Sequence, residues 1–335
     1  MTIPHPEYPR PQLVRDSYLN LNGTWRYAIT DGEDRPESYD GDILVPFSPE
    51  APLSGVERQL RPGRTLWYRR TFELPEEFAG GRVILHFGAV DETCRVWVND
   101  REAGGHSGGY LPFSFDVTDA LVEGVNTLDV AVRDGTDTGW AARGKQRLRR
   151  GGIWYTAQSG IWQTVWAERV PGTHVERLTL TPAGDRVEVT VHAAGGEAHV
   201  EILAGEEVVA TATAPAGRTV SLPLPGARLW SPEDPFLYDV TVSLGEDRVR
   251  GYVGMRTFSV GPDADGVPRL LLNGRPYFHA GILDQGYWPG GLYTPPSDQA
   301  MIDDIVAMKR LGFTMLRKHI KIEPLRWYHH CDRLG

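Results

Sequence analysis

Apolar and polar residues alternate in short runs over the first half of the chain, with glycine and proline between the runs. The alternation is clear in residues 83–87, 96–98 and 128–133. Because successive side chains of a strand point to opposite faces of a sheet, a period of two predicts half-buried β-strands. Few helical patterns interrupt these runs. We therefore expect a jelly-roll β-sandwich over residues 1–170.

The two-residue period returns after Pro171–Gly172, which we interpret as a domain boundary. The runs 187–191, 200–202 and 240–244 are separated by turns that contain glycine. Short alternating strands of this kind predict an immunoglobulin-like β-sandwich over residues 171–261. This stretch lacks the cysteine pair of antibody domains, so the prediction depends on the pattern alone.

The pattern changes from strands to helices after residue 261. In order, the expected elements are a strand at Pro276–Gly281, a helix at Ser297–Leu311 with Ser297 as N-cap, a strand at Phe313–Arg317 and a helix beginning near Pro324. This is the order in which a parallel (β/α) fold begins. An eight-fold barrel needs about 250 residues. We expect residues 262–335 to be the incomplete start of such a (β/α)8 (TIM) barrel.

The composition is that of a globular protein, with 41% hydrophobic and 24% charged residues among 335. The net charge of −9 argues against broad binding to nucleic acid or to an anionic membrane surface. Residues 1–6 lack the apolar core of a signal peptide, and no apolar run approaches the length of a membrane span. Cys94 and Cys331 lie in different expected domains, which fits a reducing compartment. A cytoplasmic protein that binds neither nucleic acid nor membranes is expected.

Residues 139–158 combine aromatic and basic side chains. They include Trp140, Arg143, Lys145, Arg147, Arg149, Arg150, Trp154 and Tyr155. Such a mixture can indicate a nucleic-acid surface, but the overall negative charge counts against it. We expect a long loop of the sandwich that packs beside the barrel, from where it could reach the substrate or a neighbouring subunit.

No metal or cofactor is expected. The run His329–Asp332 contains side chains of metal-ligand type. Adjacent residues on a helix point in different directions, so this run does not predict a zinc site.

Short stretches spread over nearly the whole chain match one family in order. They are Leu21–Trp25, Trp67–Phe72, Phe87–Asp91, Val96–Asn99, Gly108–Thr118 and Gly160–Trp166, then Leu229–Tyr238, then Gly254–Thr257 and Leu272–Pro276. The first six resemble the sugar-binding domain of glycoside hydrolase family two. Leu229–Tyr238 is similar to the signature of its immunoglobulin-like domain, and the last two resemble the run into its barrel.

The resemblance implies a retaining β-glycosidase, because the family includes β-galactosidases, β-glucuronidases and β-mannosidases. Retention uses two carboxyl groups at roughly 5–5.5 Å, one as acid/base and one as nucleophile. In the family the acid/base glutamate follows an asparagine late in the fourth barrel strand, and the nucleophile lies on the seventh. No Asn-Glu dipeptide occurs here. We expect neither catalytic glutamate within these residues.

The resemblance also places Arg317 near the family's nucleophile, where a guanidinium can keep a carboxylate ionised and oriented. The alternative is an arginine in a structural ion pair of the barrel. His319 could bind a sugar hydroxyl or pack under a loop. Lys318 is expected to be structural.

Functional groups of such barrels gather at the carboxyl ends of the strands. After the first strand, Asp284 and Gln285 could contact sugar hydroxyls or cap the loop, and Trp288 could stack on a sugar or be buried. Known galactosidases and glucuronidases usually carry an Asn-x-His type sequence here and a Ser-His-Tyr-Pro-like run after the second strand. Because this chain has Asp284–Gln285 and Lys318–Lys321 instead, sugar specificity is not carried over.

We expect the N-terminal part of a retaining β-glycosidase that acts on a β-linked saccharide or glycoside. The sequence leaves open whether the protein forms a homo-oligomer. The alternative is a non-catalytic carbohydrate-binding or scaffolding protein derived from the same family. Two βα units cannot close a barrel. We therefore expect residues beyond about Gly266 to be poorly ordered or buried against a partner chain.

Overall fold

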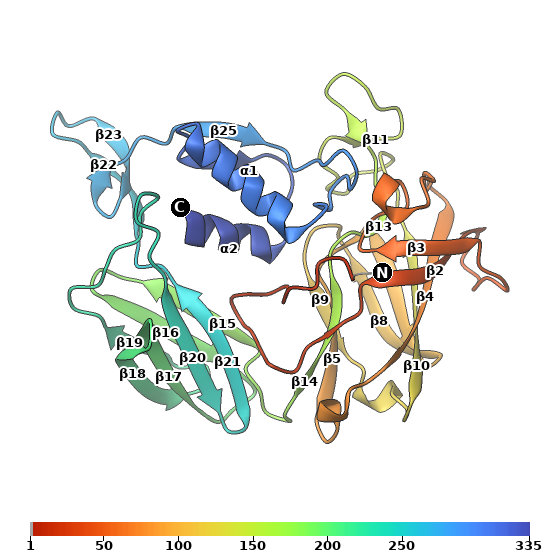
Figure 1. Cartoon of the computed structure of the whole chain (residues 1–335), viewed down its shortest axis with the longest axis horizontal. Coiled ribbons are helices and arrows are strands. Elements are labelled where there is room, and N and C mark those ends of the chain that lie inside the picture. The colour runs from red at the N-terminus through yellow and green to blue at the C-terminus, as the bar shows by residue number, and fades with distance from the viewer. Residues whose placement is uncertain (1–2) are drawn as a thin grey trace.

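The computed structural model describes residues 3–335 and divides them into three parts (Figure 1). We call them the first sandwich (residues 19–170), the second sandwich (residues 175–253) and the C-terminal segment (residues 258–335). Strands dominate, which confirms the mainly-β fold class with a jelly-roll sandwich followed by an immunoglobulin-like one. Neither of the two α-helices within residues 3–335 is long and apolar enough to cross a membrane.

Two antiparallel sheets form the first sandwich. The larger has the order β3-β2-β4-β10-β7-β8: Gly41–Val45, Gly23–Asp31, Arg64–Glu73, Val125–Arg133, Thr93–Val98 and Arg101–Ser107. The smaller has the order β1-β14-β5-β9: Leu19–Asn20, Val165–Val170, Arg82–Phe87 and Phe113–Asp116. Two short pairs lie at one end: β6 (Val90–Asp91) with β13 (Gly160–Ile161), and β11 (Gln146–Arg147) with β12 (Tyr155–Thr156). Short 3-10 turns lie at Pro52–Ser54, Glu76–Phe78 and Thr118–Ala120.

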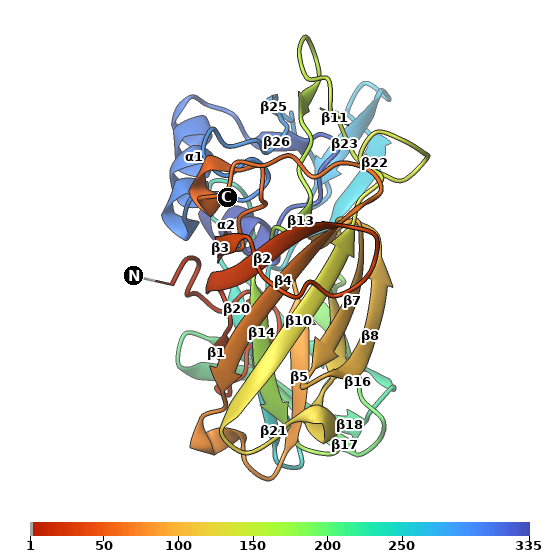
Figure 2. The same cartoon turned by 90° about the vertical axis from the view of Figure 1, so that its right-hand side faces the viewer.

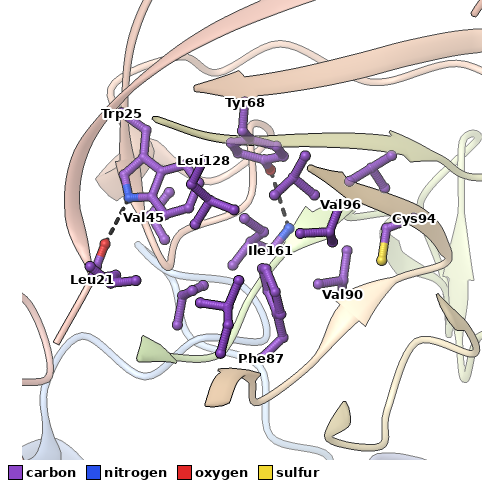
Figure 3. Close-up of a cluster of buried hydrophobic side chains, with 14 of the residues drawn as sticks. Leu21, Trp25, Val45, Tyr68, Phe87, Val90, Cys94, Val96, Leu128 and Ile161 are labelled. Carbon is purple, nitrogen blue, oxygen red and sulfur yellow. Dashed lines mark hydrogen bonds between the residues drawn. The ribbon is translucent and has the colours of Figure 1, made fainter. Parts of the chain in front are cut away.

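The core of the first sandwich lies between its two sheets and is formed by the inward positions of the alternating runs (Figure 3). Two polar groups in this core are paired: Trp25 Nε1 donates to Leu21 O at 2.8 Å, and the backbone N–H of Ile161 donates to the Tyr68 hydroxyl at 3.2 Å. Gly160 has φ +79°, and a Cβ there would lie 2.1 Å from the Tyr68 oxygen. This close approach requires glycine beside Ile161.

The second sandwich also has two antiparallel sheets. One has the order β15-β16-β19: Arg177–Pro182, Arg186–His192 and Thr219–Pro223. The other has the order β18-β17-β20-β21: Glu207–Pro215, Glu197–Ala204, Tyr238–Leu244 and Asp247–Val253. Alternate residues of β16 and β20, such as Val189 and Val242, are buried in one core. The period of two in the sequence therefore marks the inner face of each sheet.

The N-terminal arm joins the two sandwiches through a buried arginine. Arg15 is 5% exposed, and its guanidinium contacts Asp247 of β21 at 2.8 Å and Glu168 of β14 at 3.3 Å. It also donates to Val175 O at 2.6 Å. Arg10 adds a second contact to Glu168 at 2.9 Å. Charges that are far apart in the sequence thus fix the two sandwiches to each other.

The C-terminal segment begins with an antiparallel hairpin and continues as strand, helix, strand, helix. The hairpin strands are β22 (Phe258–Pro262), β23 (Pro268–Leu272) and β24 (Arg275–Pro276), followed by β25 (Gly281–Asp284), α1 (Asp298–Arg310), β26 (Met315–Lys318) and α2 (Leu325–Leu334). β25 and β26 are parallel neighbours. The boundary expected at residues 261–262 falls inside β22.

Helix α1 confirms the expected helix, and the Ser297 side chain accepts from Ala300 N as an N-cap. The expected strand at Pro276–Gly281 is wrong in position. Residues 275–276 pair with β23, Phe278 is 87% exposed, and the parallel strand begins only at Gly281. Pro276 has no backbone N–H to donate, which fits a short edge strand rather than the interior of a sheet.

A buried carboxylate clamps the two helices together. Asp298 accepts from Arg326 at 2.5 and 2.7 Å and pairs with His330 Nε2 at 2.9 Å. Although burial alone raises the pKa of Asp298, its bonds to Arg326 and His330 hold that pKa well below the usual range. The polar residues near the end of the chain therefore stabilise helix packing.

The small β25–β26 sheet has one covered face and one open face. Ile282 and Leu316 lie toward the helices, where Leu316 packs against a cluster that includes Trp327. Leu283 and Met315, on the opposite face, are 49% and 37% exposed. The helices cover one side of the sheet only.

The C-terminal segment packs against both sandwiches (Figure 1). Thr294 Oγ1 donates to Trp162 O at 2.7 Å in the first sandwich. On the other side, Asp332 accepts from Tyr252 at 2.9 Å and pairs with Arg256 at 2.7 Å. Sandwich surfaces thus cover part of the segment, while the face of β25 and β26 opposite the helices remains open.

Candidate functional site

The carboxyl ends of the two parallel strands meet a loop of the first sandwich. A pocket of about 310 Å³ lies there, lined by residues 282–288 of the C-terminal segment, by Met308 and Trp327 of the helices, and by Tyr155 of the first sandwich. Parallel strands bring their polar ends together at one edge, which is where such folds place their chemistry. Three of the five sequence-predicted residues, Asp284, Gln285 and Trp288, line this pocket.

Asp284 is engaged in structural contacts. Its Oδ2 lies 2.7 Å from Lys318 Nζ, and its Oδ1 accepts from Gly286 N at 2.9 Å. Lys318 also contacts Glu323 at 2.5 Å and lies 4.1 Å over the Trp327 ring. Lys318 therefore links β25, β26 and α2, and Asp284 both caps its loop and joins this ion pair.

Gln285 points toward the first sandwich. Its Nε2 donates to the Tyr155 hydroxyl at 3.0 Å. The Tyr155 ring is stacked on Tyr287, with 3.9 Å between the ring centroids. These contacts bridge residues more than a hundred positions apart and fix the loop after β25 against the first sandwich.

Trp288 and His319 are half-buried at the edges of the site. Trp288 packs against the helix cluster of Met301, Ile305 and Trp327. The backbone N–H of His319 donates to Asp284 O at 2.8 Å. Trp288 therefore supports the pocket wall as a packed side chain, and His319 continues the strand pairing beyond β26.

Arg317 lies on the open face of the small sheet. It stands opposite Leu283 in the strand register and is exposed. The ion pair at this strand end is made by the neighbouring Lys318, whose side chain points to the other face. The Arg317 guanidinium is therefore available to a group that approaches the uncovered side of β25 and β26.

Lys321 is a buried cation that the sequence patterns did not single out. Its Nζ donates to Tyr293 O at 2.6 Å and Gly286 O at 2.7 Å, and contacts Glu323 at 3.0 Å. Burial lowers the pKa of Lys321 to about 8 against the opposing effect of Glu323. Lys321 therefore joins the two ends of the loop at residues 286–293. A basic residue three positions after Lys318 was the only signal in the sequence.

A buried carboxyl cluster lies behind the site in the first sandwich and was also missed. Asp91 and Asp134 are 4% and 5% exposed. Ser159 joins Asp134 to Glu50: its hydroxyl donates to Asp134 at 2.6 Å, and its N–H donates to Glu50 at 3.0 Å. Gln146 Nε2 donates to Asp91 at 3.3 Å. Asp91 ends the stretch Phe87–Asp91, but nothing in that stretch showed that its carboxyl is buried.

Burial sets the protonation of this cluster. It raises the pKa of Asp91 well above the usual range, with a further contribution from Asp134, and it raises the pKa of Glu50 to about 8. The cluster contacts the candidate site through Tyr110, whose hydroxyl lies 3.0 Å from that of Tyr293. Acidic groups that hold protons near neutral pH are common at functional sites.

The unfolding free energy is expected to fall as the pH rises from about 5 to about 8. Because burial raises the pKa of these carboxyls in the folded state, the folded chain keeps protons that the unfolded chain has already released. Their contribution to the unfolding free energy is therefore complete below the pKa of the unfolded chain. It is lost as the pH rises through the pKa of the folded chain, which is about 8 for Glu50. Urea unfolding of the chain and of Asp91→Asn at both pH values measures this. The variant should show a flatter pH dependence, whereas exposed Asp119→Asn should not. An unchanged dependence in Asp91→Asn would contradict the assignment.

Two sequence models of one family match the chain. The model described as "Glycosyl hydrolases family 2, sugar binding domain" matches residues 55–168, and the model described as "Glycosyl hydrolases family 2" matches residues 173–256. The first match lies over the first sandwich and the second over the second sandwich, so together they cover more than half of the chain.

Individual relatives are similar over longer stretches. The chain is 26% identical over 307 residues to a β-glucuronidase of Paenibacillus borealis, covering 82% of this chain and 50% of that protein. It is 25% identical over 385 residues to a β-galactosidase of Halalkalibacterium halodurans, covering 100% of this chain and 36% of that protein. The chain thus spans half or less of the length of these two relatives.

The fold is shared with solved structures. A β-glucuronidase of Faecalibacterium prausnitzii superposes with a TM-score of 0.78 at 24% identity, covering 98% of this chain and 60% of that one. A Ruminococcus gnavus β-glucuronidase in complex with D-glucuronic acid gives a TM-score of 0.80 at 21% identity, covering 99% and 60%. At these identities the likeness shows a common fold.

Proposed function

Because the chain belongs to glycosyl hydrolase family 2, we propose that it is the N-terminal part of a retaining β-glycosidase that hydrolyses O-glycosidic bonds of β-linked sugars. In this proposal the two catalytic glutamates come from outside the 335 residues. Residues 1–170 are the jelly-roll sugar-binding domain, residues 171–261 the immunoglobulin-like domain and residues 262–335 the start of the (β/α)8 catalytic barrel.

The observation that carries this proposal is the β25–α1–β26–α2 unit with one open face. Helices cover one side of the parallel pair, as they cover the outside of a barrel, and Leu283 and Met315 are exposed on the other. Further strands would cover this face in a closed barrel. The open apolar side chains and the register of the two strands therefore support a barrel whose remaining units lie outside these residues.

We propose that Arg317 contacts the catalytic nucleophile. Its position on the open face at the carboxyl end of β26 would direct its guanidinium into the barrel. There it would hold the nucleophilic carboxylate ionised and oriented toward the anomeric carbon. Gln285 and His319 stay proposed contacts for sugar hydroxyls, and Asp284 is proposed to position the strand ends through Lys318.

The substrate is proposed as a β-linked glycoside. The relatives are named β-glucuronidases and β-galactosidases, and one solved neighbour holds D-glucuronic acid. These names support the β linkage and leave the choice between a uronic acid and a neutral sugar to experiment. A cytoplasmic location is also proposed, which the two free cysteines Cys94 and Cys331 support. Whether the protein forms a homo-oligomer stays open.

The 335-residue chain is expected to show no turnover of nitrophenyl β-glucuronide, β-galactoside or β-mannoside. The reason is that double displacement requires two opposed carboxyl groups. Release of nitrophenol, measured by absorbance beside a complete family enzyme as positive control, tests this. Clear turnover by the chain itself would contradict the proposal. A reading frame that continues past codon 335 and encodes both glutamates would favour it, and a natural stop codon there would favour the carbohydrate-binding alternative.

A further inference from the structure

The loop at residues 139–158, which we call the basic loop, carries an uncompensated positive charge. It holds five lysine or arginine residues, and no Asp or Glu occurs between Asp137 and Glu168, although the chain as a whole has a net charge of −9. Within residues 3–335 none of the five is paired with a carboxylate. Arg147 instead lies 3.9 Å over the Trp154 ring, and Arg150 donates to Thr156 Oγ1 at 3.0 Å.

The basic loop is nevertheless anchored in the fold. Its strands β11 and β12 pair in parallel, and Tyr155 N donates to Lys145 O at 2.9 Å. Gln146 is 2% exposed and accepts from Gln158 N at 2.7 Å. The ends of the loop are therefore held, while Arg147, Arg149 and Arg150 extend into solvent. Figures 1 and 2 show the loop standing above the first sandwich on the side of β25.

The basic loop borders the candidate site. Tyr155, near its end, stacks on Tyr287 and accepts from Gln285. At its other end, a Cβ on Gly144 would lie 3.2 Å from Ile320 O, just beyond β26. The cations therefore stand beside the carboxyl ends of β25 and β26, where a substrate of the proposed enzyme enters.

A second pocket continues from the basic loop across the first sandwich. It has a volume of about 510 Å³, and the polar side chains of Thr93, Arg133 and Thr138 contribute to its lining. Trp140 stands at its edge and is 98% exposed. A flat aromatic ring beside several hydrogen-bonding groups fits a sugar, because sugar rings present an apolar face and polar hydroxyls.

We propose that the basic loop and the Trp140 pocket bind an acidic oligosaccharide, whose carboxylate or sulfate groups contact the arginines while one sugar ring stacks on Trp140. This inference rests on the proposed function and names the substrate class: an acidic β-linked glycan that extends from the candidate site over the first sandwich. Guanidinium groups bind carboxylate and sulfate oxygens through paired N–H donors.

An acidic glycan fits this surface better than other polyanions. Glu92 and Asp134 lie in the lining of the Trp140 pocket beside Arg133 and Arg143, so the pocket is not the uniformly basic surface that a strand of closely spaced phosphates requires. The net charge of −9 also disfavours binding of a nucleic acid. A glycan that places neutral hydroxyls in the pocket and its acidic groups on the exposed arginines of the basic loop fits this arrangement.

Calorimetric titration of the 335-residue chain tests the inference with three β-linked tetrasaccharides: an oligomannuronate, which carries carboxylates only, a sulfated galactan fragment, which carries sulfates only, and the same galactan fragment without sulfate. The two acidic ligands are expected to bind more tightly than the neutral one, and the binding should weaken with added salt. Arg149→Gln/Arg150→Gln should weaken acidic-ligand binding by about tenfold, because it removes two exposed cations that pair with the acidic groups of the ligand. Trp140→Ala should weaken the binding of acidic and neutral ligands alike, because it removes the ring on which a sugar stacks.

The matched control is Arg218→Gln/Arg248→Gln, which removes two exposed arginines from the second sandwich and should leave binding unchanged. The two acidic ligands tell carboxylate from sulfate recognition. Equal binding of neutral and acidic ligands, no binding at all, equal losses in the control, or tighter binding of a DNA oligonucleotide would each overturn the inference. Concentration-dependent dimerisation abolished by Trp140→Ala, without glycan binding, would assign the surface to a second copy and also overturn it.

Different results would contradict the proposed glycosidase function and the proposed binding of an acidic glycan. Loss of the acidic-glycan binding would leave the proposed glycosidase function intact, because hydrolysis of neutral β-glycosides does not need the basic loop. Turnover by the 335 residues alone would contradict the proposed division of the catalytic site, while the calorimetric result would stand by itself.

Discussion

Arg15→Ala is expected to lower the free energy of unfolding by about 3–5 kcal/mol, the range found when one partner of a buried ion pair is removed. Arg15 is 5% exposed and contacts Asp247 and Glu168, which are 3% and 1% exposed. Its loss leaves Asp247 without a cationic partner at the junction of the two sandwiches. Urea unfolding followed by tryptophan fluorescence measures the change.

Arg95→Ala is the matched control for this experiment. Arg95 pairs with Glu102 at 2.6 Å on the surface of the first sandwich, where both side chains are exposed. Exposed pairs of this kind contribute about 0–1 kcal/mol. A loss of similar size in the two variants would contradict the view that burial at the junction gives Arg15 its effect.

Trp162→Ala is expected to cost about 3–5 kcal/mol, because it leaves a large cavity in a packed region. Trp162 is fully buried between the first sandwich and the C-terminal segment and packs with Tyr110 and Tyr293. Its Nε1 donates to Gly109 O at 2.7 Å. The variant also removes the surface on which the loop after β25 rests, so this loop should detach before the sandwich unfolds.

Two measurements separate these effects. Thermal unfolding gives the overall loss, and limited proteolysis shows whether cleavage in residues 285–294 becomes faster. Trp140→Ala removes the same side chain type from a position that is 98% exposed and should change stability by less than about 0.5 kcal/mol. Proteolysis of Trp162→Ala at the rate of the unaltered chain would show that other contacts hold the loop.

The order of the three parts was predictable from the sequence because each pattern is local. The period of two in β16 and β20 marked the inner faces of a sheet, and Ser297 marked the start of α1. The strand before α1 was placed too early, since the apolar run around Phe278 looks buried in sequence but lies exposed beside a proline. A short apolar run does not show by itself where strand pairing begins.

The candidate site was only partly predictable. Strand ends pointed to residues 284–288, and the pocket is there. Which way each side chain points was decided by partners that the sequence pattern does not reveal: Lys318 turns to Asp284 and Glu323, leaving Arg317 on the open face. The alternation of side chains along β26 makes these two neighbours face opposite sides.

The sequence alone determined the fold class, the family and the absence of an Asn-Glu pair, because these are properties of neighbouring residues and of their order. Only the tertiary structure decided that Gln285 meets Tyr155, that Lys321 is buried and that Asp91 and Asp134 share one cluster. Those contacts join segments far apart in the chain. Burial and pairing of charges arise when such segments dock, and no local pattern encodes them.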